Sequence, residues 1–285
     1  PGRGQPSLAH LLVGSEGTLA FSTRVHLGLH RVPKHKVLGI CHFPSFYSAM
    51  ESTQHIVKLG PTAVELVDRN MMDLARNIPM FSPTIEKFVQ GEPDSLLLVE
   101  FAGDDLEPQL AKLEELGTLM GDLGYPNAVV EATTGTDQSE FWNVRKSGLN
   151  IMMSMKGDSK PISFIEDCAV PLEDLAEYTD RLTNVFTKYG TKGTWYAHAS
   201  VGCLHVRPVV NLKEEEGAKT MRAIAEEAFE MVRQYKGSHS GEHGDGIVRS
   251  EFHRTMFGDR MVSNFEEIKD IFDPKGIMNP GKIVH

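Results

Sequence analysis

Cysteine is scarce in this chain of 285 residues, and its three cysteines, Cys41, Cys168 and Cys203, lie far apart with no CxxC pair. The scarcity argues against a disulfide framework and against a cysteine-ligated iron–sulfur site within the chain. A reduced, cytoplasmic location is therefore expected, and attachment to the inner face of the membrane stays open.

A basic cluster and a long apolar run are also missing. The formal net charge of −10 argues against nucleic acid as a partner. No apolar run approaches the roughly 18–20 residues of a membrane span, and the opening residues 1–6 contain neither an initiator Met nor a signal-peptide core. We therefore expect a soluble piece of a longer polypeptide. Its 40% of apolar residues can bury the core of one large or two ordinary domains.

The first half of the chain predicts the order β-α-β-β-α-β, which is that of the ferredoxin-like motif. In one of its helices Leu106, Leu110 and Leu113 recur at three- and four-residue steps, as expected for one apolar stripe against a sheet. An insertion at 68–94, with Asp68 as N-cap, predicts a helix and a loop over the core. The elements are expected as strands 37–43, 62–67, 95–101 and 128–133 and helices 45–59, capped by Ser45, and 106–123.

The same order repeats from Lys160 onward. We therefore expect an α+β fold in which two ferredoxin-like β-α-β-β-α-β units share a large antiparallel sheet with helices on one face. The other face would be open to cover a substrate. The second unit is expected as strands 162–170, 194–199, 204–209 and 237–240 and helices 172–189 and 214–235, with further helices at 138–150 and 265–271.

Two histidines flank a predicted hairpin in the second unit. Counting outward from a turn at Val201-Gly202 pairs His198 with His205. Val-Gly is not a favoured two-residue turn, but a four-residue loop over 200–203 keeps the same pairing. Directly opposed residues have Cβ atoms about 4.5–5.5 Å apart, which is close enough for two imidazoles to bind one metal ion.

A third ligand would come from the glycine-rich loop around Glu242 and His243. Two histidines and one carboxylate with a position left open are typical of a catalytic metal site. The same set also suits zinc-bound water, so a metal-dependent hydrolase is an alternative. Because the chain contains 12 histidines, they could equally be structural residues of a non-catalytic ferredoxin-like binding module.

Further segments suggest ligand contacts. The turn Gly14-Ser-Glu-Gly-Thr18 can cradle a phosphate or a flavin edge through backbone amides and a hydroxyl. Arg145, beside Trp142 on a helix, suits either a clamp for a substrate carboxylate or stacking on the ring. Lys160 is a second cation, suited to a pocket or to solvent. Two Pro and two Gly within 272–282 indicate a fixed irregular tail that caps a core or closes over a ligand.

Taken in order, the 14–18 turn, the hairpin from His198 to His205, the loop 241–244 and the tail 272–282 resemble the FAD-linked oxidases of the vanillyl-alcohol-oxidase type. The resemblance is to the C-terminal, substrate-binding part of the D-lactate, glycolate and D-2-hydroxyglutarate dehydrogenase branch, and it spans nearly the whole chain. It implies an FAD-dependent D-2-hydroxy-acid dehydrogenase.

The resemblance also implies roles for single residues. His198, His205 and Glu242 match the ligands of a divalent metal, usually zinc, and His243 matches the catalytic base. Arg145 matches the clamp for the substrate carboxylate, and Lys160 falls where a second substrate cation is found. The cofactor-binding residues would be Gly14, Ser15, Glu16, Gly17 and Thr18, the last part of a flavin domain, and Asn279, which would approach the flavin ring.

These residue types suit the oxidation of a 2-hydroxy acid to a 2-oxo acid. His243 would take the hydroxyl proton while the α-hydride passes to FAD. The hairpin departs from the family at Val201 and Cys203, where acidic and amide residues are usual, and at Arg207. An extra cation at position 207 would favour a more acidic substrate such as a dicarboxylate, or it would form a salt bridge within the protein with Glu166 or Asp167.

The resemblance divides the chain into a remnant of the FAD-binding domain at 1–34, an FAD-linked oxidase C-terminal domain at 35–258, and a C-terminal helix with a flavin-contacting tail at 259–285. The family's pyrophosphate-binding glycine loop precedes the 14–18 turn and is not in this sequence. The chain alone is therefore expected to bind FAD weakly or not at all and to be inactive. The divergent hairpin also resembles that of long bacterial members with a fused iron–sulfur domain as electron acceptor, and a homodimer is compatible with the sequence.

Overall fold

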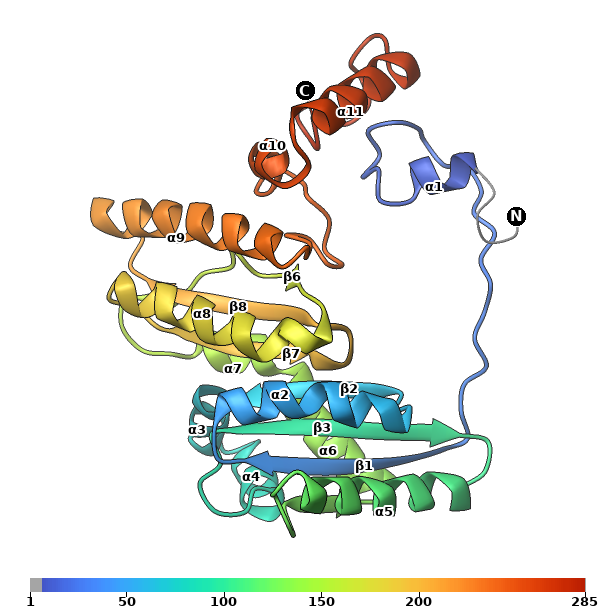
Figure 1. Cartoon of the computed structure of the whole chain (residues 1–285), viewed down its shortest axis with the longest axis vertical. Helices are drawn as coiled ribbons and strands as arrows, with labels where there is room; N and C mark the ends of the chain where they lie inside the picture. The colour runs from blue at the N-terminus through green and yellow to red at the C-terminus, as the bar shows by residue number, and fades with distance from the viewer. Residues whose placement is uncertain (1–6, 285) are drawn as a thin grey trace.

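The computed structural model describes residues 7–284, whose strands gather into one large sheet flanked by helices (Figure 1). The strands are β1 (His35–Phe43), β2 (Ala63–Asp68), β3 (Ser95–Gly103), β4 (Val129–Ala132), β5 (Lys160–Pro161), β6 (Cys168–Ala169), β7 (Gly193–His198) and β8 (Cys203–Val210). The α-helices are α1 (Leu8–Leu12), α2 (Phe46–Ile56), α3 (Arg69–Arg76), α4 (Ser82–Phe88), α5 (Glu107–Asp122), α6 (Gly135–Lys146), α7 (Gly148–Met153), α8 (Leu175–Lys188), α9 (Glu215–Gln234), α10 (His253–Phe257) and α11 (Asp259–Phe272). Short 3-10 turns cover Val57–Leu59, Leu172–Asp174, Ala199–Val201 and Ser250–Phe252.

The sheet has the strand order β4-β1-β3-β2-β7-β8-β5, and β6 also pairs with β8. The strand pairs within residues 7–284 are antiparallel. This confirms the predicted α+β class and the large antiparallel sheet. Strands β2 and β7 join the two halves, with Glu65 opposite His198 and Val67 opposite Tyr196. We call this β2–β7 pairing the seam, because the site described below lies beside it.

Side-chain caps set helix starts in the first half. Ser45 precedes α2 and accepts a hydrogen bond from Ser48 N at 3.1 Å. Asp68 precedes α3 and accepts one from Met71 N at 2.8 Å. Both caps confirm predictions from the sequence. Asp68 also accepts a hydrogen bond from Trp195 N on β7 at 2.9 Å, so the residue that starts a helix also bridges the seam.

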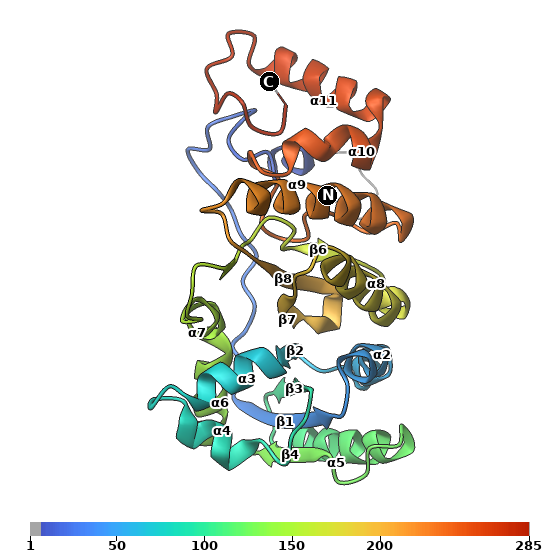
Figure 2. The same ribbon diagram turned by 90° about the vertical axis from the view of Figure 1, so that its left-hand side faces the viewer.

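Helices cover both faces of the first half of the sheet, which contradicts the prediction of helices on one face. Figure 2 shows α2 and α5 on one side and α3, α4 and α6 on the other. The reason lies in β3, where consecutive apolar residues point to opposite faces. Leu97 and Val99 belong to one buried cluster, whereas Leu96 and Leu98 belong to a second cluster with helices α3, α4 and α6. A continuous apolar run of this kind is typical of a strand buried on both faces.

The second half contains less strand than expected. Of the predicted strand 162–170 only the short β6 forms, and irregular backbone separates it from β5, which precedes the predicted range. One cause is Asp167, whose φ of 85° lies in the left-handed region. The predicted closing strand 237–240 is also wrong, since only the single bridge between Ala169 and Ser238 forms. The Ser238 hydroxyl instead donates to Ser240 O at 2.7 Å, which turns the chain away from the sheet.

The hairpin between β7 and β8 forms with a different register from the predicted one. His198 lies opposite Cys203, and His205 lies opposite Tyr196, so the direct pairing of the two histidines is wrong. The loop is a 3-10 turn closed by Gly202, whose φ is 67° and whose substitution would place a Cβ 2.0 Å from Val170 O. Because side chains alternate with a period of two, a shift of two residues leaves both histidines on the same face.

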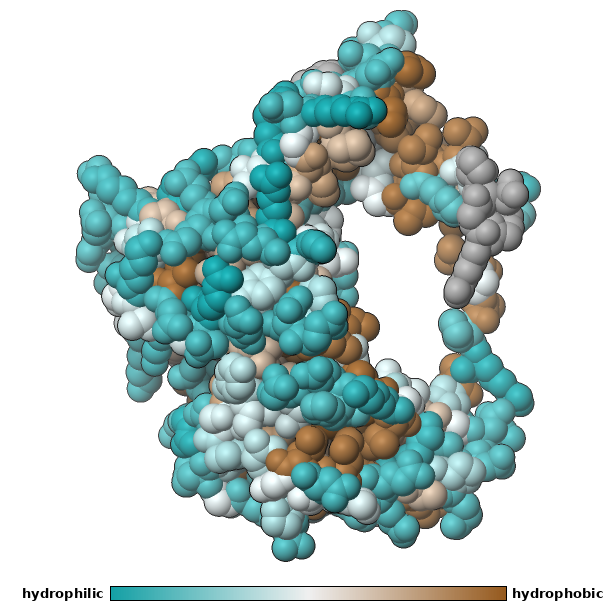
Figure 3. All heavy atoms as spheres, viewed as in Figure 1, coloured by the Kyte–Doolittle hydropathy of each residue, from teal (hydrophilic) through white to brown (hydrophobic). Residues whose placement is uncertain are grey.

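The turn 14–18 and the C-terminal tail lie together at one end of the molecule (Figure 1). In Figure 1 the segment after α1 descends alone to β1, while α10 and α11 lie above the second half of the sheet. Val25, Leu27 and Leu29 alternate along this segment but are 65–93% exposed and form no strand. Apolar side chains also gather at the surface where the α1 region meets α11 (Figure 3). No helix among residues 7–284 is long and apolar enough to cross a membrane.

Candidate metal and substrate site

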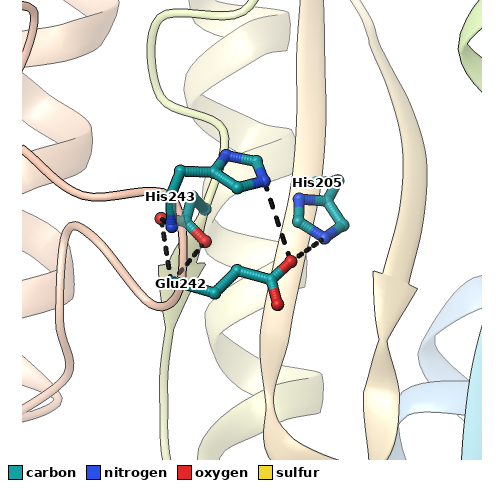
Figure 4. Close-up of side chains that lie close together, drawn as sticks. His205, Glu242 and His243 are labelled. Carbon is teal, nitrogen blue, oxygen red and sulfur yellow. Dashed lines mark hydrogen bonds and ion pairs between the residues drawn. The ribbon is translucent and has the colours of Figure 1, made fainter. Parts of the chain in front are cut away.

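Three predicted ligand side chains converge beside the seam. His198 ends β7, His205 lies on β8, and Glu242 lies in the loop that follows α9. Glu242 Oε1 lies 3.1 Å from His198 Nε2 and 3.3 Å from His205 Nε2. Figure 4 shows His205, Glu242 and His243 directed toward one another from the strand and the loop. The hairpin histidines and the glycine-rich loop, distant in sequence, therefore form one cluster.

Each hairpin histidine has a buried carboxylate behind it. Glu65 Oε1 lies 2.8 Å from His198 Nδ1, its partner across the seam. Glu166 Oε1 lies 3.6 Å from His205 Nδ1, which is too long for a hydrogen bond but places the carboxylate at the back of the ring. A carboxylate on the second ring nitrogen is the usual support of a metal-binding histidine, because it fixes the tautomer and ring orientation.

The Glu242 loop is held by one buried carboxylate, that of Asp167. Its oxygens accept hydrogen bonds from Glu242 N at 3.0 and 3.1 Å, from His243 N at 2.9 Å and from the Ser240 hydroxyl at 3.2 Å. The Cys203 thiol also lies 3.3 Å from it as a donor. Burial and the Asp167 carboxylate raise the pKa of that thiol, so Cys203 serves as a donor and not as a thiolate ligand. Asp167 thus fixes the backbone that presents Glu242.

The geometry fits a divalent metal ion. Ligands at about 2.0–2.1 Å around a tetrahedral ion lie roughly 3.3 Å from one another, close to the two Glu242 distances. A second combination, Asp167 with His205, Glu242 and His243, has ligand atoms within 4.8 Å of one another. Asp167 already accepts several hydrogen bonds, whereas His198 Nε2 contacts Glu242 Oε1 at 3.1 Å. Glu242 is about half exposed, which leaves the site open toward solvent.

The environment shifts the pKa values of the two hairpin histidines in opposite directions. Burial, with the nearby charges of His198, His243 and Arg145, lowers the pKa of His205 to about 3. The hydrogen bond to Glu65 raises the pKa of His198, although partial burial opposes it. At neutral pH the His205 ring is therefore uncharged and has a lone pair for a metal ion.

The depressed pKa of His205 predicts a pH-dependent stability in the metal-free protein. In the unfolded chain the His205 ring is protonated below about pH 6.5, whereas in the folded protein it is protonated only below about pH 3. The contribution of His205 to stability is therefore fully present above about pH 6.5 and is lost as the pH falls. At pH 5 the loss is about 2 kcal/mol relative to neutral pH. Urea unfolding of wild type and His205→Gln, with a chelator present at pH 7 and pH 5, measures it. Equal losses in the two proteins would contradict the assignment.

His243, the predicted base, lies at the rim of the cluster. Its ring stacks on His205 with centroids 5.1 Å apart, and its Nε2 lies 3.7 Å from Glu242 Oε1. The side chain is 43% exposed, so a bound substrate can reach it without movement of the loop. This is the position expected for a group that exchanges protons with both substrate and solvent.

The three predicted substrate cations differ in their placement. Arg145 is buried, pairs with Glu65 Oε2 at 2.6 Å and lies 4.7 Å from the Tyr196 ring centroid. Arg207 pairs with Glu166 Oε2 at 2.5 Å, which is the internal salt bridge left open by the sequence. Both arginines therefore pair with the same carboxylates, Glu65 and Glu166, that lie behind the two histidines. Lys160 is used differently, because its Nζ donates to Met155 O within its own loop.

The predicted flavin-contacting segments also come together. Asn279 Nδ2 in the tail donates to Glu16 O at 2.7 Å. The Glu16 carboxylate accepts hydrogen bonds from Asp245 N at 2.6 Å and from Gly246 N at 3.0 and 3.1 Å. Lys269, on α11, donates to Thr18 O at 2.9 Å. The turn 14–18, the tail and the loop that carries Glu242 and His243 therefore form one connected unit.

Three important carboxylates were not among the predicted site residues. Glu65 is the one charged residue in the predicted strand 62–67, and Glu166 and Asp167 interrupt the predicted strand 162–170. A charge within an otherwise apolar strand is a usable signal, because a buried charge requires a partner. From the sequence, Glu166 and Asp167 were predicted only as salt-bridge partners of Arg207. The contact of Glu65 with His198 depends on the pairing of β2 with β7, which the sequence did not predict.

Comparison with known proteins agrees with the motifs. Residues 32–283 match the family described as FAD linked oxidases, C-terminal domain. D-2-hydroxyglutarate dehydrogenase of Escherichia coli (strain K12) is 32% identical over 289 residues, which cover 97% of this chain and 28% of that protein. D-lactate dehydrogenase of Archaeoglobus fulgidus is 30% identical over 280 residues, which cover 98% of this chain and 58% of that protein.

The fold has a counterpart among solved structures. A 4-ethylphenol oxidase from Gulosibacter chungangensis superposes with a TM-score of 0.69 at 15% identity, over 100% of this chain and 60% of that one. At this identity the likeness concerns the fold alone. The chain spans between about a quarter and three fifths of the length of the three proteins compared. With a family match over most of its length, the chain belongs to the FAD-linked oxidase C-terminal domain family.

Proposed function

We propose that this chain binds and orients a D-2-hydroxy acid, of the D-lactate, glycolate or D-2-hydroxyglutarate type, for metal-assisted oxidation to the 2-oxo acid by an FAD-dependent dehydrogenase. The observation that supports it is the convergence of His198, His205 and Glu242, each held in place by a carboxylate or a backbone contact behind it. The names of the relatives point to the same class of substrate.

His198, His205 and Glu242 would hold a divalent ion, with zinc favoured by the nitrogen and oxygen donors. Such an ion supplies Lewis acidity toward a hydroxyl and carboxylate oxygen, and FAD supplies the hydride acceptor. His243, half-exposed beside the cluster, would accept the hydroxyl proton. The Asp167 contacts keep His243 and Glu242 at a fixed separation, so base and ligand stay aligned on one substrate.

The cations would recognise the carboxylates of the substrate. Arg145 and Arg207 each use one guanidinium nitrogen to pair with a glutamate behind the histidines. The other N–H groups of each guanidinium could bind a carboxylate of the substrate. Two arginines close to the histidine pair favour a dicarboxylate over a monocarboxylate. Lys160 would join them only if it left its contact with Met155 O.

The remaining sequence-based assignments belong to the same proposal. Gly14, Ser15, Glu16, Gly17, Thr18 and Asn279 would face the flavin, and 1–34, 35–258 and 259–285 would be the flavin-domain remnant, the substrate domain and the closing tail. Because one turn and one tail offer few flavin contacts, this chain alone would bind FAD weakly and be inactive. Each half would be a variant ferredoxin-like unit, supported in the first by the order β4-β1-β3-β2. A fused iron–sulfur electron acceptor and a homodimer stay predictions.

The experiment that tests the function is metal-dependent ligand binding to the chain, measured by calorimetry with D-2-hydroxyglutarate and D-lactate. We expect binding in the presence of Zn²⁺ and none after chelation, with the dicarboxylate bound more tightly. His205→Ala should weaken Zn²⁺ affinity by more than the roughly 10–100-fold typical of a supporting residue. His55→Ala, on α2, is the control and should leave both affinities unchanged. Equal binding of the acids with and without metal would contradict the proposal.

A further inference from the structure

A second group of ligand-type side chains lies where the loop after α9 meets α10. His253 Nε2 lies 3.0 Å from Asp245 Oδ2, and His239 Nε2 lies 3.7 Å from Asp245 Oδ1. One ligand atom from each of the three residues lies within 4.8 Å of the other two. None of the three is a ligand in the first cluster, so this group is a separate feature of the fold.

The two histidines of this group are buried, and most of the group's polar atoms lack hydrogen-bond partners. His239 and His253 are each 1% exposed. Apart from the 3.0 Å contact between His253 Nε2 and Asp245 Oδ2, no hydrogen bond within residues 7–284 reaches a ring nitrogen of the two histidines or Asp245 Oδ1. Buried polar atoms are nearly always satisfied, and each one left unsatisfied costs about 1–3 kcal/mol. Four such atoms in one place indicate that the native environment supplies a further partner.

The charge of Asp245 points to the kind of partner that is missing. Arg249 is a cation close to Asp245, but the hydrogen bonds of its guanidinium go to main-chain carbonyl oxygens, including His239 O at 3.0 Å. The ion-pair contacts of the Asp245 carboxylate within residues 7–284 are with the two histidines alone. A carboxylate between two imidazole lone pairs presents three donors to a cation.

We propose that His239, Asp245 and His253 form a second divalent-metal site, of the zinc type, in addition to the site beside the seam. Two imidazole nitrogens and one carboxylate oxygen suit zinc, cobalt or nickel better than magnesium or calcium, which prefer oxygen ligands. Aromatic rings surround the histidines, with Phe229 5.6 Å from His239 and Phe257 5.5 Å from His253, which keeps the donors fixed.

The position of the site suggests a structural role. Its ligands come from the single stretch 239–253, which contains Glu242 and His243. A metal there fastens both ends of the loop that carries these residues, one end before Glu242 and the other at the start of α10. A cavity of about 280 Å³, lined in part by Asp245 and His253, gives an ion a path from solvent.

The test separates the two sites by titrating the chain with Co²⁺ alone, whose visible absorption reports its coordination. We expect two equivalents in the wild type and one in the double variant His198→Ala/His205→Ala. The double variant His239→Leu/His253→Leu should also bind one, and the combination of all four substitutions none. Leucine replaces buried atoms that lack hydrogen bonds with apolar ones, so this pair is expected to fold, which circular dichroism checks.

His55→Ala is the matched control for the loss of a histidine elsewhere and should keep two equivalents. Asp245→Asn, which preserves shape, should weaken the second site by at least tenfold. If the folded His198→Ala/His205→Ala variant binds no Co²⁺, the second site is overturned. If the wild type binds one equivalent that only the leucine pair removes, the second site stands and the metal of the proposed function fails.

Discussion

Replacing His243 by Asn is expected to slow substrate oxidation by about 10²–10⁴-fold while leaving metal content unchanged, because the imidazole would act as a base and not as a ligand. The geometry behind this expectation is the 3.7 Å contact to Glu242, longer than either ligand contact, and the 43% exposure of the side chain. The rate of flavin reduction in an FAD-loaded enzyme containing this chain measures it, together with elemental analysis of the same sample.

Two comparisons sharpen that experiment. His205→Asn should lose both metal and activity, since His205 is 2% exposed and faces Glu242 directly. His55→Asn should lose neither. If His243→Asn removes the metal as His205→Asn does, then His243 is a ligand and the assignment of the base is wrong.

Replacing Asp167 by Asn is expected to lower the free energy of unfolding by about 2–4 kcal/mol, through weakened charge-assisted hydrogen bonds and an amide facing backbone N–H donors. Asn tolerates the left-handed backbone at φ 85°, so the substitution removes charge without new backbone strain. Since the lost bonds hold Glu242 and His243, Zn²⁺ affinity should also fall by about 10–100-fold. Urea unfolding and metal titration of the same variant measure both effects.

Asp158→Asn is the matched control, because Asp158 is 63% exposed and its partner is the surface residue Lys213. Its effect on unfolding should stay within about 0.5 kcal/mol. Should the Asp167 variant unfold like this control, the loop is held by something other than its carboxylate.

The hairpin illustrates how a site can be predicted from sequence while its geometry is not. The sequence predicted that His198 and His205 share a face of the hairpin. This holds in the observed register as well, because the predicted and observed registers differ by two residues and side chains alternate with a period of two. The sequence did not specify the register, because the loop covers residues 199–202 and so lies one residue earlier than the predicted loop 200–203. The histidines are consequently diagonal neighbours with ring centroids 4.9 Å apart instead of direct partners.

The supporting carboxylates were out of reach for a different reason. Glu65 meets His198 only because β2 pairs with β7, a contact between residues 133 apart in sequence. Local patterns predict that β2 and β7 are strands, but which strands become neighbours depends on the packing of the whole sheet. The same holds for helices α3, α4 and α6, whose packing on the second face follows from apolar residues on both sides of β3.

The contact of Glu16 with the loop has a consequence for the exchange of backbone hydrogens. The amides of Asp245 and Gly246 donate to a carboxylate from the other end of the chain. Solvent can replace those hydrogens only when the N-terminal turn moves away from the loop. When chemical exchange is faster than re-closing, their exchange rate equals the opening rate of that contact. These two backbone positions, close to Glu242 and His243, thus report in a single spectrum how stably the turn 14–18 packs against the loop.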